Sequence, residues 1–158
     1  MRWIAVFVVV LGVALVAMAG YVRLAPSDAD RWHRFVTPGP PGDSPTQGSF
    51  TARRVVEGDP QTVMTTLDAV AQDTPRTRVL AGSAEDGFVT YVTRSAFWGF
   101  PDYTTVYLTR NDPQAGGATT LTIHARLRFG QSDMGVNGAR VRGWMDALPA
   151  GVLQSPAE

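Results

Sequence analysis

The feature that constrains this chain most is an uncharged run near its N-terminus, WIAVFVVVLGVALVAMAGYV, which spans residues 3–22 and has an arginine on either side. As a helix that rises ~1.5 Å per residue, the run is roughly 30 Å long, which is the thickness of the hydrocarbon core of a bilayer. Trp3 and Tyr21 stand at its two ends, where aromatic rings prefer the membrane interface. We therefore expect residues 1–23 to be a transmembrane anchor that contacts the lipid bilayer through residues 3–22.

A cleaved signal peptide is the alternative interpretation of this run. Ala17 and Ala19 form the small-x-small pattern ahead of Gly20 at which such peptides are cut. The apolar run continues past that position to Val22, and this extra length favours the uncleaved anchor. The arginines on either side do not decide the orientation, but a short N-terminal apolar segment generally leads the following domain across the membrane. We expect a single-pass protein of the inner membrane with a periplasmic domain.

The composition excludes several classes of protein. The chain of 158 residues has room for one ordinary domain, and its hydrophobic content of 44% with zero net charge argues against disorder and against a strongly basic nucleic-acid-binding protein. It has no cysteine, so disulfides and thiolate chemistry are excluded. All fourteen basic residues are arginine, each a permanently charged, forked donor. We expect no cofactor and no nucleic-acid partner.

Residues 24–49 connect the apolar run to the domain. The arm, SDADRWHRFV at residues 27–36, mixes aromatic rings with arginines, and it can lie on lipid headgroups or pack on the domain. The linker that follows, TPGPPGDSPTQGS at 37–49, has four prolines and three glycines. Its composition predicts a partly extended spacer with a reach of up to ~40 Å. The folded domain is then expected at 50–149, with a tail at 150–158.

The pattern within the domain predicts an α+β fold. A first strand near 50–58 is followed by a helix for which Asp59 is the cap and Pro60 the first residue. Runs rich in Thr, Val and Tyr predict four more strands at 76–82, 88–95, 103–110 and 119–129, with turn-like AEDG and NDPQAGG sequences between them. A last helix is expected at about 135–148. The prediction is an antiparallel sheet of about five strands with two helices packed on one face, in the order β-α-β-β-β-β-α, preceded by one transmembrane helix.

Apolar residues mark the faces that these elements bury. The first helix carries one apolar stripe and the last helix another, and alternate residues of the last strand are expected to face both helices. The buried set comprises Val63, Met64, Leu67, Val70 and Ala71, then Leu121, Ile123, Ala125, Leu127 and Phe129, then Val141, Trp144, Met145 and Leu148. The opposite face of the last strand carries Thr122, His124, Arg126 and Arg128. Such a face can bind a phosphate or carboxylate, although a solvated face with cross-strand ion pairs is the favoured interpretation.

The stretch RLRFGQSDMGVNGAR, residues 126–140, predicts a corner between strand and helix. Gly130 permits a backbone turn, and Ser132 or Asp133 is expected to accept hydrogen bonds from the first N–H groups of the helix. Asn137 falls on the apolar stripe of that helix, so its side chain needs a polar partner such as Arg140.

A second dense stretch, TRSAFWGFPDYTTVYL at residues 93–108, contains Phe97, Trp98 and Phe100. Gly99 and Pro101 interrupt its strand-like pattern and predict a bend. We expect the three aromatic rings to close one end of the core. The alternative is that they contact lipid or a partner protein.

Two classes of function follow from these residues. The favoured class is a membrane-anchored binding or accessory module for a protein partner, a membrane complex, or an anionic or lipid ligand. The alternative is an envelope enzyme, a hydrolase that uses Asp102, His124 and Asp133. The chain has two histidines without a carboxylate at ligand spacing, so no metal site is predicted. The candidate residues for anion or ligand binding are Arg94, Asp102, His124, Arg126, Arg128, Asp133, Asn137 and Arg140.

The motifs PRTRVLAG, TRSAFWGFPDYTTV and RLRFGQSDMGVNGARVRGW resemble those of a bacterial family known as domain of unknown function 1499. The resemblance covers roughly residues 28–148, including the RWH sequence of the arm. It implies a single-domain envelope protein with an N-terminal apolar segment. It implies no activity, substrate or catalytic residue.

Overall fold

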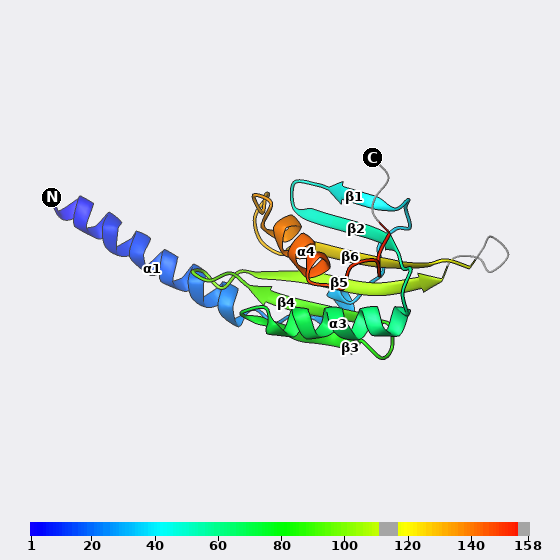
Figure 1. Cartoon of the computed structure of the whole chain (residues 1–158). Coiled ribbons are helices and arrows are strands. Elements are labelled where there is room, and N and C mark those ends of the chain that lie inside the picture. Colours follow the sequence, from blue (N-terminus) through cyan, green and yellow to red (C-terminus); the bar gives the residue numbers. More distant parts are fainter. Residues whose placement is uncertain (111–116, 155–158) are drawn as a thin grey trace.

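The computed structural model describes residues 1–110 and 117–154. Within them, six antiparallel strands form one open sheet in the order β1-β2-β6-β5-β4-β3 (Figure 1). The α+β class is confirmed, with one strand more than the sequence predicted. The strands are β1 (Gly42–Pro45), β2 (Ser49–Val55), β3 (Thr77–Ser83), β4 (Phe88–Arg94), β5 (Pro101–Arg110) and β6 (Thr119–Leu127). Most of the NDPQAGG turn lies outside the described residues.

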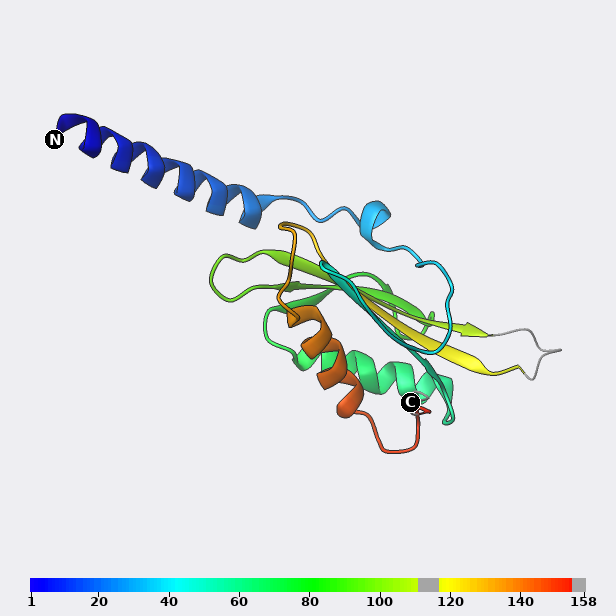
Figure 2. The same cartoon turned by 90° about the horizontal axis from the view of Figure 1, so that it is seen from above.

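Two helices, α3 (Pro60–Asp73) and α4 (Val136–Asp146), cover one face of the sheet (Figures 1 and 2). As predicted, the carboxylate of Asp59 caps α3 by accepting from the backbone N–H of Thr62 at 2.7 Å. The helices join where the indole N–H of Trp144 donates to the hydroxyl of Thr74 at 2.8 Å. The core between helices and sheet contains Val63, Met64, Leu67, Ala71, Leu121, Ile123, Ala125, Val141, Trp144 and Leu148, with Val70 and Met145 partly buried beside it.

The predicted alternation of β6 is confirmed at its centre. Leu121, Ile123 and Ala125 are buried beneath the helices. His124 pairs with Thr51 of β2 and Thr105 of β5, so these three side chains lie on the opposite face. The sheet therefore separates two chemically different surfaces.

The arm covers that opposite face. It contains α2 (Ala29–Trp32), and Figure 2 shows it on the side of the sheet away from α3 and α4. The Trp32 ring is buried against Tyr103, and the rings of His33 and Phe35 stack on Phe88 with centroid distances of 3.7 and 4.2 Å. Of the two arrangements left open by the sequence, the structure has the arm packed on the domain.

Part of the linker is not the spacer that its composition predicted. Residues Gly42–Pro45 form the edge strand β1, which pairs with β2. Asp43 holds this strand in place because its carboxylate contacts Arg54 at 2.6 Å and Arg142 at 3.5 Å. An edge strand tolerates proline, so composition alone did not indicate it.

The N-terminal helix α1 (Arg2–Leu24) projects away from the sheet (Figures 1 and 2). It has the length and hydropathy of a membrane span, criteria that an N-terminal signal sequence also meets. Its last turn contacts the domain, because the carbonyl oxygen of Val22 accepts from Arg94 at 3.4 Å and the ring of Tyr21 lies 6.1 Å from that of Phe129.

The C-terminal residues return to the sheet. Leu153 forms a bridge with Val56, and the N–H of Gln154 donates to the carbonyl oxygen of Val55 at 2.9 Å. The segment predicted as a tail is therefore attached to the end of β2 as far as residue 154, and the remainder lies outside the described residues.

Candidate functional site

Four of the sequence-predicted site residues lie together at the N-terminal end of α4, on the helix face of the sheet. They are Asp102 of β5, Asp133 just before α4, and Asn137 and Arg140 within it. Arg140 donates to the amide oxygen of Asn137 at 2.8 Å and lies 3.3 Å from the carboxylate of Asp102. Asn137 is fully buried, and Arg140 supplies the polar partner that its amide oxygen required, whereas its amide nitrogen has no hydrogen-bond partner within the described residues. Burial raises the pKa of Asp102, and the charge of Arg140 opposes this shift in part.

Asp133 belongs to the same corner and acts as a cap. Its two carboxylate oxygens accept from the backbone N–H groups of Gly135 at 3.1 Å and Asn137 at 2.9 Å. Gly135 is the N-cap residue of α4 and Asn137 lies in its first turn, where a helix has no internal acceptors for its N–H groups. The corner is thus a structural cluster in which each charged group already has a partner.

Three other predicted residues lie on the opposite face, beneath the arm. The imidazole of His124 is 2.8 Å from the hydroxyl of Thr51. Arg126 donates to the carbonyl oxygen of Trp32 at 2.6 Å, and Arg128 donates to the carbonyl oxygen of Pro26 at 2.8 Å. The solvated face that we favoured is wrong, because carbonyl oxygens of the arm and of Pro26, just before it, accept the hydrogen bonds of these arginines.

The hydrolase arrangement is not formed. His124 shares a sheet row with Thr105, whereas Asp102 shares one with Leu127, so their side chains project from opposite faces. Burial and two nearby arginines, Arg126 and Arg53, lower the pKa of His124 to about 4, so this imidazole is neutral near pH 7. Within the described residues, no group of three His, Asp or Glu side chains is placed to hold a metal ion.

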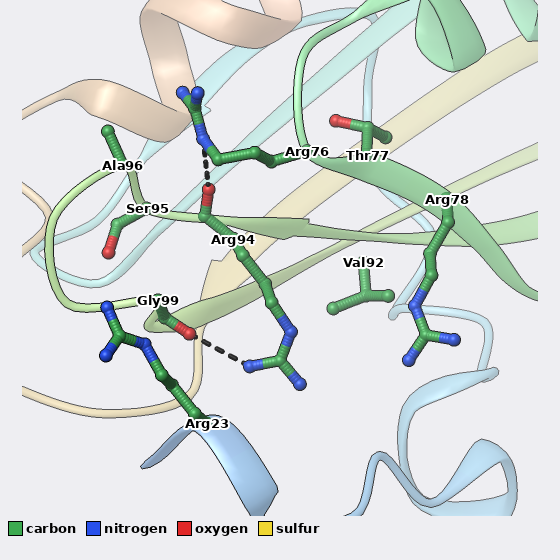
Figure 3. A pocket seen from close by; sticks show the side chains of 9 residues that line it. All are labelled: Arg23, Arg76, Thr77, Arg78, Val92, Arg94, Ser95, Ala96 and Gly99. Carbon is green, nitrogen blue, oxygen red and sulfur yellow. Dashed lines mark hydrogen bonds between the residues drawn. The ribbon is translucent and has the colours of Figure 1, made fainter. Parts of the chain in front are cut away.

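The remaining predicted residue, Arg94, lies in a cleft of about 530 Å³ beside the last turn of α1. We call it the arginine cleft, because Arg23, Arg76, Arg78 and Arg94 line it together with Thr77, Val92, Ser95, Ala96 and Gly99. No carboxylate is among these residues. Figure 3 shows the side chains of Arg78 and Arg94 directed to the same side of the strands, with Val92 between them.

Backbone carbonyl oxygens orient two of these arginines. Arg94 donates to the carbonyl oxygen of Gly99 at 2.9 Å, and Arg76 donates through Nε to that of Arg94 at 3.1 Å (Figure 3). Arg76 has a left-handed backbone, with φ of 61°, at the turn into β3. Arg78, at the start of that edge strand, is exposed, and its side chain makes no hydrogen bond or ion pair within the described part of the chain.

Three residues of the cleft, Arg23, Arg76 and Arg78, were not among the predicted site residues. Arg76 and Arg78 stand two positions apart in a predicted strand, a spacing that predicts side chains on one face. In the structure Arg76 precedes β3 and has a positive φ, and Figure 3 shows its side chain directed away from that of Arg78. Nothing in the local sequence pattern indicated that the end of β4 and the last turn of α1 would lie beside Arg76 and Arg78 in one cleft.

The loop between β4 and β5, residues 95–100, borders the arginine cleft. The prediction that its aromatic rings close the core is wrong for two of them, because Phe97 is 76% exposed and Trp98 is 40% exposed. The two rings contact each other with centroids 5.0 Å apart. Phe100 is partly buried and lies 6.1 Å from the ring of Phe129.

These features define a small α+β domain with an arginine-lined cleft beside an N-terminal apolar helix. The chain belongs to the family described as "Protein of unknown function (DUF1499)", whose match covers residues 33–148, from within the arm to just past the end of α4. This match confirms the resemblance seen in the motifs. No curated protein and no solved structure matched the chain.

Proposed function

We propose that this protein is a membrane-anchored binding module whose domain takes up an anionic group in the arginine cleft. The observation that carries the proposal is a cleft lined by four arginines and no carboxylate, in which the guanidinium groups of Arg78 and Arg94 lie on the same side of the strands, whereas that of Arg76 is directed to the other side (Figure 3). Like charges in proximity repel, and a bound anion removes this repulsion. Guanidinium groups bind phosphate and carboxylate through paired N–H donors, so an oxyanion is the ligand class that suits the cleft.

The way in which the arginines are held supports binding. The carbonyl oxygens of Gly99 and Phe97 accept hydrogen bonds from Arg94 and Arg23, and they orient these two guanidinium groups without neutralising their charge. Each guanidinium has five N–H donors, so most remain available to a ligand. Because the side chains are already oriented, less conformational entropy is lost when the anion binds.

We also propose that α1 remains attached as a single-pass anchor in the inner membrane, with the domain in the periplasm. The helix runs without a break through Ala19 and Gly20 to Leu24, and its last turn packs on the domain. The full-length protein should stay in the membrane fraction after carbonate washing, and protease added outside the inner membrane should cut the domain. A soluble mature form that begins near Gly20 would contradict the anchor.

Binding of inorganic pyrophosphate to the full chain in a neutral detergent tests the cleft. Isothermal titration at low ionic strength should show binding that weakens as salt is added, because salt screens the charges. Arg78→Gln should weaken it, whereas Arg110→Gln, the same change at the far end of β5, should not. Equal affinity of both variants and the unaltered protein, or no binding at all, would refute an anion site in the cleft.

A further inference from the structure

The position of the arginine cleft indicates which anion it meets. Arg23 is the first charged residue after the uncharged run 3–22. Its guanidinium donates to the carbonyl oxygen of Phe97 at 2.9 Å, which joins the end of the apolar helix to the tip of the β4–β5 loop. If α1 spans a bilayer, this contact lies at the level of the lipid headgroups, since the hydrocarbon core ends where the apolar run ends.

Gly99 favours the close approach of α1 to the loop. A Cβ atom at this position would lie 3.1 Å from Cγ of Arg23, and Gly99 has a positive φ of 74°. The residue therefore permits both the bend of the loop and the close packing of Arg23 against it. The cleft is held at the membrane end of the domain by this packing as well as by the chain connection.

The exposed rings of Phe97 and Trp98 stand at the same end. Large aromatic side chains usually bury most of their surface, and aromatic rings are enriched where protein meets the membrane interface. Leu24, the last residue of α1, is also exposed, at 84%. A soluble anion in the cleft would leave these apolar side chains in water, whereas a bilayer surface would cover them.

We infer that the ligand of the arginine cleft is the phosphodiester headgroup of an anionic phospholipid in the bilayer that α1 spans, with Phe97 and Trp98 inserted beside it. This inference rests on the proposed function and names its ligand. The phosphodiester supplies the negative charge that the lining lacks, and its acyl chains lie in the layer that the two rings enter. The domain is then held against the membrane at two places, α1 and the β4–β5 loop.

Lipid retention by the full chain tests the headgroup. Native mass spectrometry of the protein released from mixed micelles should show retained phosphatidylglycerol in preference to phosphatidylcholine. One arginine near a membrane surface contributes about fivefold to the affinity for anionic lipid, so Arg78→Gln should lower this preference about fivefold and Arg78→Gln/Arg94→Gln roughly 30-fold. Arg110→Gln should leave it unchanged. The side chain of Arg78 has no polar partner within the described residues, so its replacement should leave the fold intact.

A spin label measures whether the loop is inserted in the bilayer. Because the chain has no cysteine, one introduced cysteine is the only site of labelling. A nitroxide label on Phe97→Cys, in the full chain reconstituted in phosphatidylglycerol-containing nanodiscs, should be accessible to oxygen and shielded from a water-soluble nickel complex. The same label on Thr109→Cys, at the far end of β5, should be accessible to the nickel complex.

The outcomes separate the two proposals. Pyrophosphate binding without a preference for phosphatidylglycerol overturns the lipid inference and leaves the anion site in place. Absence of both overturns both proposals. A label at position 97 that is as accessible to the nickel complex as the label at 109 overturns the insertion of the loop.

Discussion

The indole ring of Trp32 lies flat on the phenol ring of Tyr103, with centroids 4.0 Å apart and an angle of 13° between their planes. The same residue accepts hydrogen bonds through its carbonyl oxygen from Arg126 at 2.6 Å and from Thr105 at 3.3 Å. The ring and the backbone of one residue therefore hold the arm against β5 and β6.

Trp32→Ala should release the arm from the sheet. Truncation of a buried tryptophan typically costs ~3–5 kcal/mol. Because Trp32 belongs to the arm, this change should mainly lower the free energy needed to detach the arm from the sheet. Limited proteolysis should cut residues 27–41 faster in this variant than in the unaltered protein. Trp32→Phe, which keeps a stacked ring, should be cut at a rate close to that of the unaltered protein. Equal cutting of the alanine variant would show that the ring does not hold the arm.

Arg126→Gln should lower stability without weakening anion binding. Its guanidinium is committed to the carbonyl oxygen of Trp32, and a hydrogen bond from a charged group contributes ~1.5–3 kcal/mol to the free energy of unfolding. Chemical denaturation and pyrophosphate titration of the same protein give both quantities. Arg78→Gln should show the reverse pattern, with stability kept and affinity reduced. Loss of pyrophosphate binding in Arg126→Gln would place the anion beneath the arm instead of in the arginine cleft.

The stability of the domain should fall as the pH falls from 6.5 to about 5. The pKa of His124 is about 4 in the folded protein, against 6.5 for a free histidine side chain, so the unfolded chain takes up a proton first. The free energy of unfolding then decreases by roughly 2 kcal/mol over this range. Denaturant titrations at several pH values measure the slope.

Two variants identify the residue responsible for this slope. His124→Gln should remove most of the pH dependence, because glutamine does not titrate and still offers a polar group to Thr51. Burial also lowers the pKa of His33 in the arm, so His33 contributes to the pH dependence as well. His33→Gln should remove that contribution and reduce the slope accordingly. A slope that His124→Gln leaves unchanged would show that this imidazole titrates normally in the folded state.

Asp133→Ala should cost about 1–2 kcal/mol of stability, because its carboxylate oxygens accept from the N–H of Gly135, the N-cap of α4, and from the N–H of Asn137 in the first turn. Asparagine keeps one acceptor oxygen and replaces the other with a donor, so Asp133→Asn should fall between alanine and the unaltered protein. Thermal unfolding ranks the three proteins. Equal losses for asparagine and alanine would show that the negative charge of Asp133, beyond its cap hydrogen bonds, holds the corner.

The sequence by itself determined the local elements of this protein. The cap at Asp59, the apolar stripe of α3 and the alternation of β6 depend on residues a few positions apart. The structure confirms the first two, and it confirms the third at the centre of the strand but not at Leu127 and Phe129, which lie outside the core. The capping role of Asp133 and the need of Asn137 for a partner followed from the same kind of local chemistry. The length and apolar character of residues 3–22 likewise needed no tertiary information.

Only the tertiary structure decided which surfaces these elements share. The edge strand β1 depends on contacts of Asp43 with Arg54 and Arg142, which lie elsewhere in the chain. The arm covers His124 and Arg126, and the sheet places His124 and Asp102 on opposite faces. Residues from α1, the start of β3 and the end of β4 form the arginine cleft. Periodicity reports which face of an element is apolar, but the pairing of faces from distant segments depends on the packing of the whole chain.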